Sequence, residues 1–542
     1  MSKVASYLQE HILGEVTTNP AILKAMSRDG SVLQVMPEMV IYPRTTNDIR
    51  KVARFAWQLA EKGHTLPLTA RGNGADETGG AIGKGIIISL PAHMNRIFEL
   101  DPKQKLVRVQ PGVNASALHE ALMLQGIGIP ALPSSALYST IGGAVANNAS
   151  GPLSGKYGSV GDWTHQLEVV LATGDVLQTG RISKKELNKR KGMGTFEGEI
   201  YRNLDNLIED NKQLIDEHLG SEIRDNVGYA AVARVKQKDG SFDLTPLFAG
   251  SQGTLGIISE MIMKGEFMSI HTGIAVAAFN DDHAARDALD QLRRLEPAFL
   301  EYYEGDLFKM AAAEGRTYSF NKDLEAEPSA VVVVGFDDFN ERARHKKLKK
   351  IEKVLNAYAT VAVADGEDVS ELMAVRGVTA FSHVPAAKDA SAPAIVDGAF
   401  VPNERFEDFS AAVHALAEKM DVALPLQYRA LDGIVCARPV LHLNKVGDKQ
   451  KIFKLLDEYG SLVDHHGGHM IGEDGEGRLK AKFAYKALDP KIIELFESIK
   501  GIFDPYGILN PGVKQEAEVR QLVPQLRSDF DIASIADYVP HS

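Results

Sequence analysis

Short apolar runs alternate with longer amphipathic stretches over the first half of the chain. Residues 39–42 are all apolar, which is typical of a buried strand. A helix is predicted next, with Thr46 or Asn47 as its N-cap, because apolar residues then recur at helical spacing. Further strands are predicted at 66–69, 85–90 and 106–109. The alternation of strands, helices and glycine turns predicts a mixed α and β fold.

The pattern changes at about residue 266. Strands are predicted at 274–279 and 331–336, and a charged amphipathic helix follows each of them. Strand–helix units are predicted again at 398–419 and 438–460. This second pattern predicts an α+β domain built on an antiparallel sheet.

The two ends of the chain have a different character from its centre. Residues 1–35 are predicted to be helical, with turns near 17–20 and 28–30. A glycine-rich segment at 467–477 leads to a predicted helix at 490–501, and the polar last 30 residues are also predicted to be helical.

Composition and charge exclude several classes of protein. A net charge of −12 over 542 residues does not provide the basic footprint of a nucleic-acid binder. Cys436 is the only cysteine, so the chain can form neither an internal disulfide nor a cysteine-based metal site. No signal peptide and no apolar run long enough to span a membrane is apparent. We expect a cytoplasmic protein, with a peripheral position at the inner face of the membrane as the alternative.

Three clusters of small residues carry the candidate chemistry. They are residues 71–80, 133–151 and 250–258. Successive glycines let backbone N–H groups converge on an anion, because no Cβ blocks the approach. The first cluster has neither the G-x-x-x-x-G-K nor the G-x-G-x-x-G spacing, so it is neither a Walker loop nor a Rossmann fingerprint. Taken alone, the first cluster is equally consistent with a turn between strands.

The clusters together resemble the FAD-binding domain of the vanillyl-alcohol oxidase and p-cresol methylhydroxylase superfamily. Within it, the chain is most similar to the D-lactate dehydrogenase and glycolate oxidase flavoprotein branch. Residues 67–80 match P-x-x-x-R-G-x-G-T-x-x-x-G-G with Ala75 in place of threonine. Residues 133–151 match P-S-S…T-I-G-G-x-x-A-x-N-A-x-G, and residues 250–257 match G-S-E-G-T-L-G-I with Gln252 in place of glutamate. Residues 503–512 match F-D-P-x-x-x-x-N-P-G.

The resemblance implies non-covalently bound FAD and a division of the chain into four parts. These are an N-terminal helical extension (1–35), a PCMH-type FAD-binding domain of two subdomains (36–265), a cap domain for the substrate (266–465) and a C-terminal segment that packs on the FAD domain (466–542). The residues that the resemblance places at the cofactor are Arg71, Gly72, Asn73, Gly74, Ala75, Gly79, Pro133, Ser134, Thr140, Gly142, Gly143, Asn147, Gly151, Tyr157, Gly253, Thr254, Ile258 and Asn510.

Oxidation of a 2-hydroxy acid requires a cation for the carboxylate and a base for the hydroxyl proton. Arg376 lies in a segment similar to the W-x-x-R of these proteins and is the candidate cation, with a surface salt bridge as the alternative role. Lys388 is a weaker candidate for a second contact with the carboxylate.

The candidate base is the point at which the sequence departs from the family pattern. The resemblance implies a G-H-x-G-D-G-N-L-H segment, in which His442 matches the second histidine and Val435 occupies the place of the first. It also implies G-E-H-G-x-G, in which Glu473 matches the metal-binding glutamate and Asp474 replaces the catalytic histidine. Either Asp474 is the base, if burial raises its pKa, or the mechanism differs. A divalent metal on His442 and Glu473 would be one ligand short, and we expect none.

The expected function is therefore that of an FAD-dependent dehydrogenase. Its substrate would be a small 2-hydroxy acid similar to D-lactate, and its electrons would pass to a quinone, a cytochrome or a protein. Two alternatives stay open. One is another flavoenzyme of the same fold, such as an oxidase with a different alcohol substrate. The other is a catalytically silent flavin subunit of an electron-transfer complex. The sequence does not indicate an oligomeric state.

Overall fold

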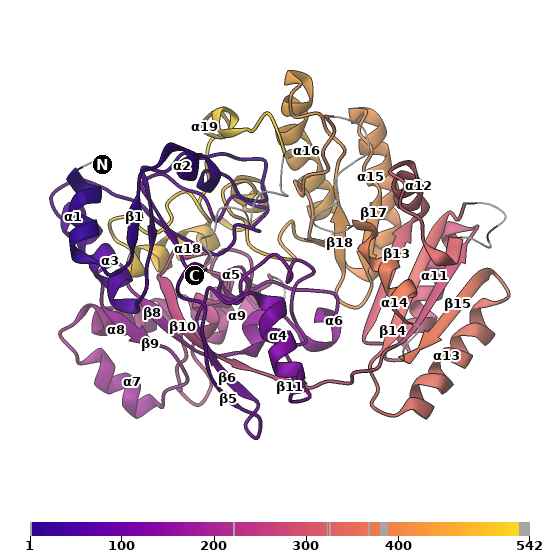
Figure 1. Ribbon diagram of the computed structural model, residues 1–542, viewed down its shortest axis with the longest axis horizontal. Helices are drawn as coiled ribbons and strands as arrows, with labels where there is room; N and C mark the ends of the chain where they lie inside the picture. Colours follow the sequence, from indigo (N-terminus) through magenta and orange to yellow (C-terminus); the bar gives the residue numbers. More distant parts are fainter. Residues whose placement is uncertain are drawn as a thin grey trace.

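A computed structural model describes residues 3–220, 223–321, 324, 327–366, 369–379 and 389–530. Two main sheets, of four and five strands, and the short two-stranded sheet of β7 (Ile127–Gly128) and β11 (Glu266–Phe267) lie in the N-terminal half of the chain, and a seven-stranded sheet lies to their right in Figure 1. The C-terminal segment, drawn in yellow, returns from the larger sheet to the N-terminal half. The chain therefore joins a two-sheet unit to a one-sheet unit, with the C-terminal segment in contact with the first.

The first sheet is largely parallel, and its two central strands are fully buried. Its order is β1-β2-β4-β3, in which β2, β4 and β3 run parallel and β1 pairs antiparallel with β2. Every residue of β2 and of β4 is buried, as expected for short parallel strands that are covered on both faces. The elements of this part are α1 (Lys3–His11), β1 (Glu15–Thr17), α2 (Pro20–Met26), β2 (Met39–Tyr42), α3 (Thr46–Ala60), β3 (Leu68–Arg71) and β4 (Ile86–Ser89).

The second sheet is antiparallel, in the order β5-β6-β10-β8-β9. Apolar residues of its central strands share one core with α8 and with the C-terminal helix α18 (Pro490–Phe503). The elements here are β5 (Ile97–Asp101), β6 (Leu106–Val109), α4 (Ala115–Met123), β7 (Ile127–Gly128), α5 (Ile141–Ala146), α6 (Ser154–Tyr157), β8 (Thr164–Val170), β9 (Val176–Gln178), α7 (Lys184–Lys191), α8 (Phe196–Asp210), α9 (Lys212–His218), α10 (Thr245–Phe248), β10 (Ile257–Lys264) and β11 (Glu266–Phe267).

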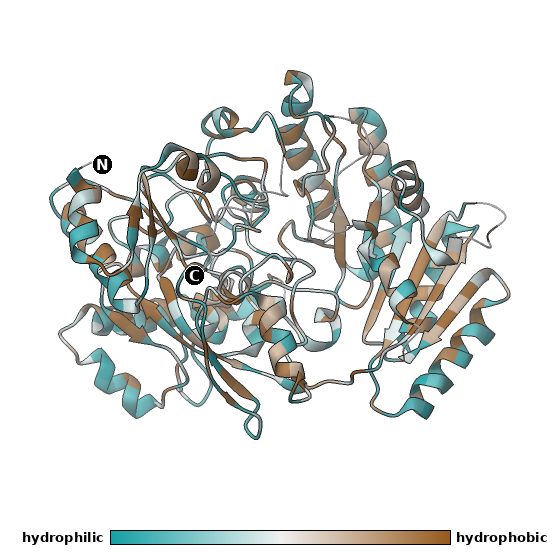
Figure 2. Cartoon of the chain, in the orientation of Figure 1, coloured by the Kyte–Doolittle hydropathy of each residue, from teal (hydrophilic) through white to brown (hydrophobic). Residues whose placement is uncertain are grey.

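The third sheet has seven strands in the order β15-β12-β14-β13-β17-β18-β16, and all its pairings are antiparallel. Apolar residues of α11, α13, α15 and α16 belong to the core on one face, and those of α12 and α14 to the core on the other. Figure 2 shows these strands mostly in brown, whereas α13 carries much teal. The elements are β12 (Gly273–Phe279), α11 (Asp282–Arg293), β13 (Phe299–Glu304), α12 (Gly305–Ala313), β14 (Ala330–Phe336), α13 (Glu341–Leu355), β15 (Ala359–Asp365), α14 (Val369–Met373), β16 (Ala399–Phe400), α15 (Phe406–Met420), β17 (Leu426–Arg429), β18 (Ile434–Ala437) and α16 (Val446–His465).

The C-terminal segment crosses back to the first sheet after α16. It contains α17 (Ala481–Ala484), α18 and α19 (Val519–Leu522). The Leu68 N–H donates to Ile508 O at 2.7 Å and the Asn510 N–H donates to Leu68 O at 2.8 Å, so this segment extends the edge of the sheet at β3. Within the described ranges, no helix combines the length and the apolar character needed to cross a membrane.

The fold class predicted from the sequence is confirmed, including the antiparallel sheet of the second pattern. The strands expected at 39–42 and 106–109 are found at those residues. The wholly helical N-terminus was wrong, because Glu15–Thr17 pairs with β2 as an edge strand. The strand expected to begin a unit at 438 was also wrong, since β18 ends at Ala437. Residues 531–542, where a helix was expected, lie outside the described residues.

Candidate active site

The three glycine-rich clusters meet around one cavity. It holds about 920 Å³, part of which is open to solvent. The loop after β3, the turn into α5 and the approach to β10 all contribute to its wall. The described residues that line it are Ala70, Arg71, Gly72, Asn73, Gly74, Ala75, Asp76, Gly80, Ala81, Leu90, Pro111, Pro133, Ser135, Ser139, Thr140, Gly142, Gly143, Ala144, Ala146, Asn147, Ala149, Gln252, Gly253, Gly256, Ile258 and Asp474. We call this space the glycine cavity.

Close packing of neighbouring segments explains two of the glycines. A Cβ on Gly142 would lie 2.4 Å from Pro111 Cβ and 2.7 Å from Pro111 O, so any side chain would push α5 away from the loop that follows β6. A Cβ on Gly72 would lie 2.3 Å from Thr140 Oγ1, the atom that accepts the Gly143 N–H and caps α5. The two segments are thus held together with no room for side chains between them.

Arg71 supports the first loop from behind. The side chain is buried, and its Nη1 donates to Ala81 O at 3.1 Å. Burial lowers the pKa of Arg71, and the carboxylates of Asp29 and Asp76 oppose that shift. Arg71 therefore fixes the shape of the loop around Gly74, whose backbone has φ +80°.

Asp76 and two amide side chains link the three clusters. Asn147 Nδ2 donates to Asp76 Oδ1 at 2.9 Å, and Gln252 Nε2 donates to Asn147 Oδ1 at 3.1 Å. Gln252 Oε1 accepts the Gly477 N–H at 3.0 Å. The position therefore needs a donor and an acceptor at once, which an amide provides and an ionised carboxylate does not. This accounts for glutamine where the resemblance implies glutamate.

The glycine cavity fits the FAD that the sequence led us to expect. Gly72 and Gly142 keep its floor free of side chains, which a flat ring system requires. Ser139 Oγ is buried in this wall and has no hydrogen-bond partner among the described residues. A buried hydroxyl without a partner is costly, so its presence in the wall indicates a polar ligand group.

A second cavity adjoins the first. It holds about 880 Å³, and Pro133, Ser135 and Asp474 belong to the walls of both. Its wall combines the C-terminal segment with strands of the seven-stranded sheet. The described residues that line it are Glu77, Thr78, Pro133, Ser134, Ser135, Pro152, Glu301, Arg376, Thr379, Ala394, Asp397, Gly398, Gln427, Arg429, Cys436, Arg438, Glu473, Asp474 and Lys480. We call this space the charged cavity.

Two arginines of the charged cavity form bidentate ion pairs. Arg376 Nε and Nη2 each donate to a carboxylate oxygen of Glu301 at 2.8 Å. Arg438 donates to both oxygens of Glu77 at 2.8 and 2.9 Å and also lies 3.0 Å from Asp397 Oδ2. Paired guanidinium groups of this geometry are fixed in position, so they form a rigid polar wall.

Arg429 completes the wall beside Glu473. Its Nη2 lies 3.0 Å from Asp432 Oδ2, and its Nη1 lies 3.3 Å from Glu473 Oε1. Burial raises the pKa of Glu473 to about 7, although Arg429 acts against that shift.

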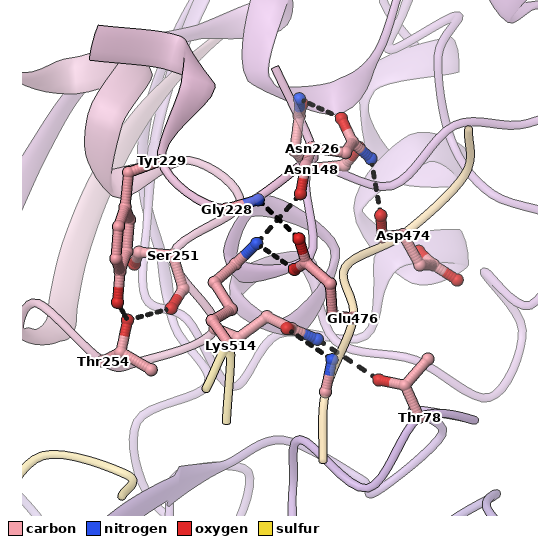
Figure 3. A network of polar contacts seen from close by, with 12 residues as sticks. Thr78, Asn148, Asn226, Gly228, Tyr229, Ser251, Thr254, Asp474, Glu476 and Lys514 are labelled. Carbon is pink, nitrogen blue, oxygen red and sulfur yellow. Dashed lines mark hydrogen bonds and ion pairs between the residues drawn. The ribbon is translucent and has the colours of Figure 1, made fainter. Parts of the chain in front are cut away.

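Asp474 lies where the two cavities meet. Burial raises its pKa well above the usual range, and the neighbouring carboxylates of Glu473, Asp76 and Glu77 raise it further. Its backbone has φ +57° and is held by Asn226 Nδ2, which donates to Asp474 O at 2.8 Å. Figure 3 shows the Asp474 side chain directed away from the neighbouring Glu476 and Lys514. A carboxyl group in this environment stays protonated to higher pH than a solvent-exposed one, which is typical of groups that transfer protons.

Several residues that the resemblance placed at the cofactor do not line the glycine cavity. Asn510 instead joins segments behind it, donating to Gly80 O and Gln252 O at 2.8 Å. Thr254 Oγ1 contacts the Tyr229 hydroxyl at 2.7 Å, and the Tyr157 hydroxyl donates to Asp337. Ser134 lines the charged cavity, while Gly79 and Gly151 line neither. The other predicted cofactor residues all belong to the wall of the glycine cavity.

The predicted catalytic residues are only partly brought together. Arg376, Glu473 and Asp474 share the charged cavity, whereas His442 is not among the described residues of either wall. His442 Nδ1 instead lies 3.3 Å from Asp448 Oδ2. Lys388 lies outside the described residues. Within the described part of the chain, no group of three metal-ligating side chains is found. Arg429 Nη1 lies 3.3 Å from Glu473 Oε1, so a cationic side chain already stands beside the carboxylate that would bind the metal. The described residues therefore do not fit a divalent metal there.

Sequence reasoning missed Lys480, Arg438 and Gln252 as site residues. Arg438 and Glu77 are 361 residues apart in the chain, and Gln252 and Gly477 are 225 apart. No local pattern marks such pairs. Lys480 could have been noticed from the sequence, since it follows Asp474 by six residues and lies just after the glycine-rich segment 467–477.

Models of two protein families match the sequence. The FAD binding domain family matches residues 37–180, and the C-terminal domain family of FAD linked oxidases matches residues 270–513. The structure also superposes on p-cresol methylhydroxylase with a TM-score of 0.66 at 13% identity, covering 94% of this chain and 96% of that one. The FAD-binding and FAD-linked oxidase domains that the motifs suggested are thereby confirmed, and the superposition confirms the fold.

Curated relatives are similar over most of the chain at low identity. D-2-hydroxyglutarate dehydrogenase of Escherichia coli (strain K12) is 26% identical over 521 residues, which cover 93% of this chain and 50% of that protein. Glycolate oxidase subunit GlcD of Bacillus subtilis (strain 168) is 27% identical over 495 residues, covering 90% of this chain and 91% of that protein. The chain thus spans about half the length of the first of these relatives.

Proposed function

The chain contains the FAD binding domain and the C-terminal domain of FAD-linked oxidases, and from that premise we propose that it oxidises a 2-hydroxy acid at C2. The substrate would be a small acid similar to D-lactate, and the product the corresponding 2-oxo acid. Electrons would leave for a quinone, a cytochrome or a protein acceptor. Relatives named for dehydrogenation of D-2-hydroxyglutarate and for glycolate oxidation support this reaction class.

The observation that carries the proposal is the position of Asp474. It belongs to the wall of the glycine cavity and to that of the charged cavity, so one carboxyl group faces the place of the cofactor and the place of the substrate. The cations in the charged cavity suit a carboxylate substrate, because charge-assisted hydrogen bonds are the strongest that such a ligand can form.

The residues would divide the reaction as follows. FAD supplies the acceptor for the hydride that leaves C2. Ionised Asp474 takes the proton of the C2 hydroxyl group, and the oxygen–carbon double bond of the 2-oxo acid forms as the C2–H bond breaks. The ion-paired wall of Arg376, Arg429 and Arg438 gives the substrate site a fixed shape and contributes positive charge beside the carboxylate of the substrate.

The test is an anaerobic visible spectrum of the purified protein during addition of D- and L-2-hydroxy acids. We expect one acid of the panel to bleach the flavin band, with its enantiomer much slower. A band that persists with every acid would contradict the proposed reaction. The same experiment on glycine variants tests the cofactor cavity separately.

Replacing Gly142 by alanine is expected to weaken FAD binding at least about tenfold, because the added Cβ collides with the backbone of Pro111 and displaces α5. The measurement is flavin titration of the apoprotein, followed by fluorescence. The matched control is Gly501→Ala, since a Cβ on Gly501 meets no atom within 4 Å. Equal affinity of the two variants would show that the approach of α5 to Pro111 does not shape the FAD site.

A further inference from the structure

Lys480 differs from the arginines around it in the charged cavity. Arg376, Arg429 and Arg438 each lie within ion-pair distance of at least one carboxylate. Lys480 Nζ has no such partner among the described residues and donates one hydrogen bond, to Asp397 O at 2.6 Å. Its side chain is nevertheless buried, because the residue is only 3% exposed.

A buried ammonium group with spare donors is an unusual feature. Lysine has three N–H donors, and the hydrogen bond to Asp397 O uses one of them. Burial of a positive charge is costly unless it is paired and hydrogen-bonded. Lys480 therefore has both the charge and the donors to bind an anion that enters the cavity.

The chain places Lys480 at a fixed offset from Asp474. Both belong to the segment 473–480, which packs against the FAD domain through the residues between them. Glu476 Oε1 accepts the Gly228 N–H, and Arg478 Nε donates to Ile82 O at 3.0 Å (Figure 3 shows the first of these). Glu473, Asp474 and Lys480 line the charged cavity. One anchored segment thus presents a proton acceptor and a free cation to the same space.

We propose that Lys480 Nζ binds the carboxylate of the substrate and so sets the position of C2 relative to Asp474. This inference rests on the proposed 2-hydroxy acid as substrate. Arg376 is the less suitable anchor, because Glu301 already engages two of its donors in a bidentate pair and Phe299 stacks 3.8 Å from its guanidinium carbon. A carboxylate can bind at Lys480 without breaking an existing ion pair.

The test compares Lys480→Gln with Lys482→Met in the FAD-loaded protein. Glutamine at position 480 removes the charge but keeps an N–H donor for Asp397 O, so the segment retains its support. Lys482 is two residues away and pairs with Glu518 near the surface at 3.2 Å, which makes it a matched control. The probe is oxalate, an unreactive carboxylate analogue of a 2-hydroxy acid, and its binding is measured by calorimetry.

We expect Lys480→Gln to weaken oxalate binding about 10- to 100-fold, the effect of losing a hydrogen bond to a charged group, with unchanged flavin content. Lys482→Met should stay within about twofold of the parent protein. For the acid that reduces the flavin, Lys480→Gln should raise KM more than it lowers kcat.

The outcomes separate this inference from the proposed function. If the parent protein and Lys480→Gln bind oxalate equally, or the parent does not bind it, the inference is wrong. It is also wrong if Arg376→Met loses binding while Lys480→Gln keeps it. If Lys480→Gln alone loses oxalate but no 2-hydroxy acid reduces the flavin of the parent protein, the anion site stands and the proposed reaction falls.

Discussion

Replacing Glu476 by glutamine is expected to lower the free energy of unfolding by about 3 to 5 kcal/mol, because it leaves the Lys514 ammonium buried without its counter-charge. Both side chains are 0% exposed, and Lys514 Nζ lies 2.5 Å from Glu476 Oε2. The Gly228 N–H donates to Glu476 Oε1, and Lys514 Nζ donates to Asn226 O at 2.9 Å. Figure 3 shows that these groups converge from three separate segments. The loss would therefore loosen the junction of the C-terminal segment with the FAD domain.

Urea unfolding followed by tryptophan fluorescence measures this effect. The chain has two tryptophans, Trp57 and Trp163, and both lie in the N-terminal half that the pair supports. The control is Glu518→Gln, which breaks the exposed pair with Lys482 and should cost about 1 kcal/mol at most. The double variant Glu476→Gln/Lys514→Met should lose less than the sum of the two single changes, because neither charge is then left unpaired. Equal losses for the buried and the exposed pair would contradict the prediction.

The sequence predicted the elements that depend on local pattern. Residues 39–42 are all apolar and all buried, so the strand could be placed without knowing its neighbours. Glu15–Thr17 has no such pattern, and it forms a strand only because the edge of β2 accepts it. The helix at Thr46–Ala60 was also recognised, but its predicted N-cap, Thr46 or Asn47, was wrong. The N-cap is Thr45, and all three residues have a side-chain oxygen that can accept a hydrogen bond at a helix N-terminus.

The part of the candidate site that consists of local sequence motifs could be predicted. The glycine clusters identify most of the residues that line the glycine cavity, because a run of residues with small side chains is visible in the sequence itself. A motif does not show which of its residues line the cavity and which stabilise the loops around it. Asn510 and Thr254 are of the second kind, because their side chains contact Gly80 O and the Tyr229 hydroxyl. The charged cavity was hardest to foresee, since pairs such as Glu77 with Arg438 form only when the two halves of the chain meet.

Replacing Asp474 by asparagine is expected to lower kcat about 10²- to 10⁴-fold, the usual contribution of a general base, while FAD content stays unchanged. The amide is nearly the same size but cannot accept the hydroxyl proton. Because the pKa of Asp474 is raised, the parent enzyme should speed up as the pH rises through that pKa and ionises the base. The variant should lack this rising limb. The matched control is Asp464→Asn, since burial raises the pKa of Asp464 to about 6 but the residue lines neither cavity.

Stability should respond to the Asp474→Asn change in the opposite direction. A carboxyl group whose folded pKa lies above its unfolded pKa contributes fully below the unfolded value, and its contribution is lost as the pH rises through the folded value. The parent protein therefore loses stability as the pH rises and Asp474 ionises, and the asparagine variant avoids that loss. We expect the resistance of the variant to urea, relative to the parent, to increase as the pH rises, although the variant is far less active. An asparagine variant with the same rising pH–rate limb as the parent would show that another group takes the proton, and Glu473, with a pKa of about 7 in the same wall, would be the residue to test next.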